Sequence, residues 1–180
     1  VARGTNVSAA QLLLKKGANP NAKESQRGQT ALMWAAANSQ GPMVRLLVEG
    51  GAAVDAKTDT DLMTPLVSAE PRAQPRSPGG MTALMFASRE GCLECVTAMI
   101  DKGASVDLPD PEGVTPLIWA IWNTRFDVAK YLIDHGANVN RFDWWGRTPL
   151  YLAVDYVTLP HGGRPDQPSL DRTLPIDVVK

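Results

Sequence analysis

The 180-residue chain has few of the side chains that build common chemical sites, with only two cysteines and two histidines. Two cysteines cannot form the disulfide framework of a small secreted domain. A net charge of −1 offers no basic excess for a phosphate backbone, so we expect no nucleic-acid partner. No stretch approaches the roughly 18 apolar residues of a membrane span, and the first ten residues lack the apolar segment of a signal peptide. The compartment, cytoplasmic or exported, stays open, because the chain does not begin with Met.

Motifs for catalysis and cofactor binding are also missing. The sequence contains neither a G-x-x-x-x-G-K-[ST] phosphate loop nor a dinucleotide fingerprint. The "HGG" at His161 matches part of an esterase oxyanion motif, but no G-x-S-x-G elbow accompanies it. Asp155 and Asp177 flank the same region, and nothing in the sequence brings them together as a two-carboxylate hydrolase requires. We therefore predict a protein that is not an enzyme and holds no metal or cofactor.

Cys92 and Cys95 form a C-x-x-C pair for which three interpretations stay open. In the first, Cys95 is a small core residue and Cys92 is half-exposed at the start of a helix. In the second they are a redox pair, although such pairs usually follow a strand in a thioredoxin-like fold, which this chain lacks. A zinc site is the third, and it would need more ligands than the distant His135 and His161 supply. Of the three, we expect the packing role.

What the sequence does contain is an internal repeat. The T-[AP]-L element at Thr82, Thr115 and Thr148 recurs every 33 residues, and an earlier copy begins at Thr30. A G-A-x-[VP]-[ND] element recurs in phase with it. Its copies begin at Gly17, Gly51, Gly103 and Gly136. Chance does not account for two elements in one phase, so the chain is predicted to be a repeat array.

One unit shows the local physics that these elements encode. The Thr115 hydroxyl can cap a helix, and Pro116 suits the first helical position, where its missing N–H costs nothing. Leu117, Ala120 and Ile121 then fall on one helical face. Gly136 ends a second helix, because glycine readily adopts the left-handed conformation after a helix. Each helix pair exposes an apolar stripe until a neighbouring pair covers it.

These features resemble the ankyrin repeat, whose unit is a β-turn plus two antiparallel helices over about 33 residues, with a T-P-L-H-x-A signature. The resemblance covers nearly the whole chain. It implies an all-α solenoid with short β-turn fingers, in a single array over residues 1–180. We place a half repeat at 1–23, full repeats at 24–57, 79–109 and 110–142, and a partial repeat at 143–180.

The chain departs from the family pattern in two ways. The fourth signature position, usually His, holds Met33, Met85, Ile118 or Tyr151, so apolar contacts should replace the family's imidazole network. In this respect it looks more like bacterial ankyrin proteins than animal ones. The spacing departs as well, because Thr30 and Thr82 are 52 residues apart. We interpret the surplus as an insertion between repeats, rather than a decayed repeat, and expect another between the last helices. These insertions cover about 58–79 and 156–174.

Two groups of aromatic residues share informative positions. Trp34, Phe86 and Trp119 share one repeat position, which predicts core packing between repeats. Trp144 and Trp145 instead lie in a turn, at finger-tip positions that face solvent in the family. Either at least one of these rings contacts a partner, or one packs against the neighbouring finger or under the 58–79 insertion.

The resemblance implies a non-catalytic interaction module that binds a protein partner on a concave surface of finger tips and first helices. Carried over from the family's contact positions, the candidate partner-binding residues are Trp144, Trp145, Arg147, Trp122, Asn123, Arg89, Glu90 and Asn38. Residues in the insertions are secondary candidates, namely Arg72, Arg76 and Arg164. Two alternatives stay open. One is self-assembly into an oligomer or filament through stacked repeat ends, and the other is an accessory domain of a larger enzyme.

Overall fold

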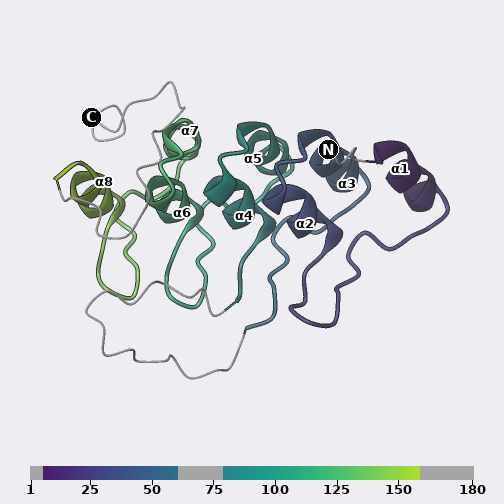
Figure 1. Cartoon of the computed structure of the whole chain (residues 1–180), viewed down its shortest axis with the longest axis horizontal. Coiled ribbons are helices and arrows are strands. Elements are labelled where there is room, and N and C mark those ends of the chain that lie inside the picture. The colour runs from purple at the N-terminus through teal and green to yellow at the C-terminus, as the bar shows by residue number, and fades with distance from the viewer. Residues whose placement is uncertain (1–5, 61–78, 159–180) are drawn as a thin grey trace.

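A computed structural model describes residues 6–60 and 79–158 as a stack of helix pairs (Figure 1). Within these ranges the regular structure is helical, apart from isolated β-bridges. The helices are α1 (Val7–Lys15), α2 (Ala31–Ala37), α3 (Gly41–Glu49), α4 (Ala83–Glu90), α5 (Leu93–Ile100), α6 (Pro116–Trp122), α7 (Phe126–Asp134) and α8 (Pro149–Thr158). Most of both expected insertions, with Arg72, Arg76, His161, Arg164 and Asp177, lies outside the described residues.

The helices form two layers. The inner helices α2, α4, α6 and α8 each pack on the next, and the outer helices α1, α3, α5 and α7 do the same behind them. Within each pair, α2 packs on α3, α4 on α5, and α6 on α7. The fingers extend from one side of the stack, below the inner helices in Figure 1. The predicted all-α solenoid is confirmed.

The inner helices begin where the threonine elements predict. The Oγ1 of Thr30, Thr82 and Thr115 accepts a hydrogen bond from the backbone N–H three residues later, at 3.4, 3.3 and 3.3 Å. All three residues have extended backbone, as a capping position requires. Gly136 follows α7 with a φ of 91°, in the left-handed region that favours glycine.

The core confirms one sequence expectation and corrects another. Met33, Met85 and Ile118 are buried, so apolar side chains do occupy the position where the family carries its imidazole. Phe86 and Trp119 are also buried, but the equivalent Trp34 is exposed, and the prediction of core packing is wrong there. The cause is its neighbourhood: in the part of the chain that the structure describes, no inner helix precedes α2.

The long connection between α3 and α4 leaves and re-enters the stack at one point. Lys57 forms an antiparallel bridge with Thr82, and Thr60 forms one with Gly79. Between these bridges, the Thr58 N–H donates to the Met81 carbonyl at 3.0 Å. The two ends of the connection therefore lie together, and helices α2 and α4 pack directly on each other.

Cys92 and Cys95 are joined in a disulfide at the start of α5. Cys92 is the N-cap of this helix and half-buried, whereas Cys95 is fully buried in the core. Their Cα atoms are 5.2 Å apart, a separation that a disulfide spans without backbone movement. The packing role expected for Cys95 is correct, but the packing interpretation did not include the bond between the two sulfurs.

Candidate functional site

Four side chains meet where the last finger approaches the end of α6. We call Trp122, Asp143, Trp145 and Arg147 the Arg147 cluster. The Arg147 guanidinium carbon lies 4.6 Å from the ring centroid of Trp122 and 4.6 Å from that of Trp145. This arrangement places a cation between two aromatic faces, whose negative quadrupoles attract it. The cluster thus joins one inner helix to the finger of the next repeat.

Asp143 shapes the finger and also holds the cation. Its Oδ1 accepts hydrogen bonds from the backbone N–H groups of Trp145 and Arg147, at 3.0 and 2.9 Å. Its Oδ2 accepts from Arg147 Nε at 2.8 Å. Gly146 allows the turn between them, because its φ of 73° is strained for other residues. Since the Asp143 side chain is fully buried, this carboxylate fixes Arg147 through both backbone and side chain.

The two adjacent tryptophans have different surroundings. The Trp144 backbone N–H donates to the Glu112 carbonyl of the neighbouring finger at 2.7 Å, yet 78% of its surface is exposed. Trp145 is 44% exposed and lies against Arg147. Trp122 is buried, so it supports Arg147 and presents little surface of its own. The finger therefore holds one ring in solvent on an anchored backbone and packs the other partly inside.

The neighbouring finger also has an aspartate that accepts backbone hydrogen bonds, but no arginine among the described residues pairs with this carboxylate. Asp110 Oδ1 accepts from the backbone N–H groups of Glu112 and Val114, both at 2.9 Å. The buried Asp110 Oδ2 finds no hydrogen-bond partner within the described ranges. Burial is the main cause that raises the pKa of the Asp110 carboxyl, and nearby Lys57 opposes it. Burial also raises the pKa of Glu112, helped by the negative charges of Asp110 and Asp143.

The remaining candidates lie at the ends of the inner helices. Asn38 and Asn123 occupy equivalent positions after α2 and α6, and each side-chain amide donates to a backbone carbonyl of its own helix at 2.8 Å. At the end of α4, Arg89 lies 5.2 Å from the Phe86 ring centroid and pairs with Glu90 at 2.8 Å. Because the inner helices stack, these residues follow one row along the solenoid. Trp122, at the end of α6, connects that row to the Arg147 cluster.

Sequence reasoning missed the part that Asp143 plays. Asp110 and Asp143 each precede the turn glycine of their finger by three residues, so a recurring D-x-x-G element was visible in the sequence. Short carboxylates in such turns often accept hydrogen bonds from backbone N–H groups two residues on. That signal predicts the Oδ1 contacts. The pairing of Oδ2 with Arg147 depends on the folded finger.

Two other kinds of site are not found in residues 6–60 and 79–158. No group of three or more His, Cys, Asp or Glu side chains there is placed to hold a metal ion. Helices able to cross a membrane, which must be both long and apolar, are not found in the same ranges.

Comparison with known families identifies the repeat. A model of ankyrin repeats in three copies matches residues 1–71 and 69–143, and a model of ankyrin repeats in many copies matches residues 123–164. No curated protein matches the chain. Ankyrin repeats generally serve as protein–protein interaction modules. The matches cover most of the chain and agree with its stacked helix pairs and capped inner helices, so the protein belongs to the ankyrin repeat family.

Proposed function

We propose that the protein binds a protein partner through the exposed rings of Trp144 and Trp145 and the adjacent Arg147. The observation that carries this proposal is the surroundings of Trp144, which is 78% exposed while its backbone N–H is hydrogen-bonded to Glu112. A large ring on a fixed backbone loses little conformational freedom on binding, and the apolar area it offers is large. Tryptophan and arginine are also the side chains most often found at the energetic centre of protein interfaces.

Each member of the surface has a separate task in this proposal. Trp144 is the anchor that a partner pocket covers. Trp145 and Arg147 form the floor beside it, held in place by Trp122 and Asp143. Because Asp143 balances the charge of Arg147, the floor can be covered without leaving an unpaired cation. Asn38, Arg89, Glu90 and Asn123 extend the surface along the inner helices and orient the partner by polar contacts.

The test is partner capture by the native chain and by two matched variants. Phe142 offers the control, because it is an exposed aromatic residue in the same finger and lies outside the Arg147 cluster. Partners enriched on the native chain are identified, and the dissociation constant of each is measured. We expect Trp144→Ala to weaken binding by about thirtyfold, the size of an interface hot spot, and Phe142→Ala to change it little. Equal binding by Trp144→Ala and the native chain would overturn the proposal.

A further inference from the structure

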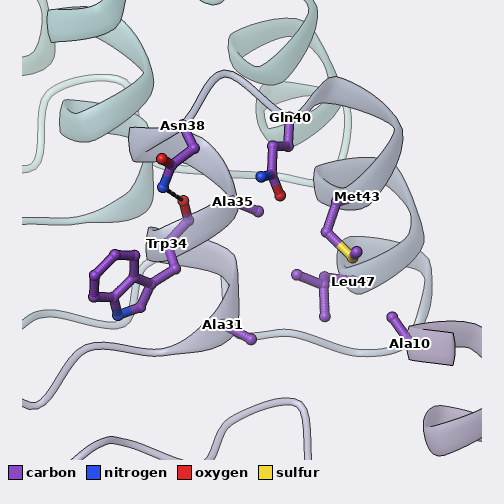
Figure 2. Close-up of a pocket in the computed structure, with 8 residues that line it drawn as sticks. All are labelled: Ala10, Ala31, Trp34, Ala35, Asn38, Gln40, Met43 and Leu47. Carbon is purple, nitrogen blue, oxygen red and sulfur yellow. Dashed lines mark hydrogen bonds between the residues drawn. The ribbon is translucent and has the colours of Figure 1, made fainter. Parts of the chain in front are cut away.

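The first inner helix of the stack has an uncovered face. Trp34 on α2 is 56% exposed, whereas its counterparts Phe86 on α4 and Trp119 on α6 are 6% and 8% exposed. Beside it lies an open groove of about 430 Å³ (Figure 2). Ala31 and Ala35 of α2, Met43 and Leu47 of α3 and Ala10 of α1 line this groove with Trp34. Its lining is mostly apolar.

Helix α1 shows what is missing from this groove. It is an outer helix and packs on α3, but its Leu13 is exposed. The residues that match Leu13 in the other outer helices, each of which packs on an inner helix, are buried. They are Leu47, Met99 and Leu132. The groove between α1 and α2 is therefore the place of an inner helix that the described residues do not supply.

The opposite end of the stack carries a helix of that type. Inner helix α8 packs on α6, and within the described ranges no outer helix follows it. Its Leu150 and Tyr151 are both 55% exposed, and Val154 is exposed beside them. The matching residues of α2, a helix that packs on both α3 and α4, are fully buried. They are Leu32, Met33 and Ala36.

We propose that the chain associates head to tail, with α8 of one copy lying in the groove between α1 and α2 of the next. One copy then supplies the inner helix and the other the outer helix of a single composite pair. The contact repeats the stacking within each chain, where α2 packs on the next inner helix and its Leu32, Met33 and Ala36 are buried. Leu150, Tyr151 and Val154 would meet Ala31 and Trp34 in the same way. The small side chains of Ala10, Ala31 and Ala35 leave the room that a helix needs.

This interface joins two different surfaces, so it does not close on itself. Each added copy presents a free groove at one end and a free α8 at the other. Such contacts build open filaments, or rings where the rotation per copy allows closure. The interface uses neither Trp144 nor Arg147. It shares Asn38, which also lines the groove, with the proposed partner surface.

The experiment measures the mass of the 180-residue chain by light scattering over a wide concentration range. We expect the mass of the native chain to rise with concentration. Trp34→Glu blocks the groove and Leu150→Glu blocks α8, so each should weaken association at least about tenfold. Both residues are exposed, and helical circular dichroism checks that each variant still folds. Phe142→Glu, at an exposed aromatic residue outside both surfaces, is the matched control and should associate like the native chain.

Mixing the two blocked variants gives the decisive result. The Trp34→Glu chain keeps a working α8, and the Leu150→Glu chain keeps a working groove. Together they should form a dimer and stop there, because the remaining two ends are both blocked. A native chain that stays monomeric at every concentration overturns the proposal, including the case in which a segment of the same chain fills the groove. So does association that survives both variants, or a mixture that forms no dimer.

Discussion

Arg147 Nε donates to Oδ2 of Asp143 at 2.8 Å, and the Asp143 side chain has no exposed surface. The same carboxylate accepts two backbone hydrogen bonds, so one side chain couples the path of the finger to the position of the cation. A surface ion pair contributes little to stability, but removing one partner of a buried pair leaves the other uncompensated.

Replacing Asp143 in two steps should separate its two tasks. Asp143→Asn keeps an Oδ1 acceptor for the backbone and loses the charge, and we expect it to cost about 1–2 kcal/mol of unfolding free energy. Asp143→Ala also removes both backbone contacts and should cost about 2–4 kcal/mol. Urea denaturation followed by circular dichroism measures both values. If the two variants unfold alike, the backbone contacts contribute nothing measurable to the finger.

Arg147→Lys tests the stacking of the cation between the two rings. Lysine keeps the charge but lacks the planar group that lies over Trp122 and Trp145. We expect a loss of about 1 kcal/mol in stability and easier quenching of tryptophan fluorescence by acrylamide. The same substitution made on a Trp145→Ala background should cost less. An equal cost on both backgrounds would show that Trp145 does not interact with the cation.

Asp110→Asn should alter the pH dependence of stability in a direction set by burial. Folding raises the pKa of Asp110. The protonated carboxyl therefore contributes stability to the folded chain below the unfolded-state pKa. This contribution is lost as pH rises through the folded-state pKa. Asparagine keeps the Oδ1 acceptor and does not ionise. We therefore expect Asp110→Asn to match or exceed the native stability at neutral pH. Below the raised pKa this advantage should disappear. Thermal unfolding across acidic and neutral pH measures the difference.

Glu24 is a control whose pKa is shifted in the opposite direction to that of Asp110. Its carboxylate accepts backbone hydrogen bonds from Gln29, Gln26 and Arg27, and the bond from Gln29 is the largest cause lowering its pKa. A lowered pKa contributes stability above the unfolded-state value, and that contribution is lost as pH falls through the folded-state value. Glu24→Gln should therefore be less stable than the native chain at neutral pH and approach it in acid. Identical pH profiles for the Asp110 and Glu24 variants would contradict both assignments.

Reduction of the Cys92–Cys95 disulfide should loosen the start of α5 without unfolding the stack. The bond closes a very short loop, so its chain-entropy contribution is at most about 2 kcal/mol. The core around Cys95 is otherwise continuous with that of both neighbouring repeats. We expect dithiothreitol to lower the melting temperature by a few degrees while the helical signal at room temperature stays unchanged. Alkylation and mass measurement confirm the reduction, and a Cys92→Ser, Cys95→Ala chain should show no response.

The fold was predictable from the repeat because each sequence element determines the backbone conformation only of residues close to it in the chain. Thr115 caps the turn that follows it, and Gly136 ends the helix that precedes it, so both effects are encoded where they occur. The exposure of Trp34 was not predictable in this way. Trp34 and Trp119 are the same residue at the same repeat position, and they differ because only Trp119 lies beneath a preceding inner helix. Burial in a stack is decided by the neighbouring repeat, not by the residue.

The candidate site was also predictable only where its features are encoded locally. The sequence was enough to place Trp144 and Trp145 in a turn, since the glycine and the repeat phase fix that position. It was not enough to show that Trp145 packs on Arg147 while Trp144 does not. That difference depends on the turn at Gly146, which brings Arg147 back over the Trp145 ring, and on the buried Asp143 that holds Arg147.

The bridge between Thr60 and Gly79 marks a place where this protein can accept inserted sequence during evolution. The two ends of the intervening segment meet at a finger tip. Helix α2 packs directly on α4, so this contact does not need the segment between Thr60 and Gly79. Closing a longer loop adds only about 0.6 kcal/mol for each doubling of its length. The position is therefore an entry point for foreign sequence: a peptide epitope or a small domain grafted there would leave the helical register intact.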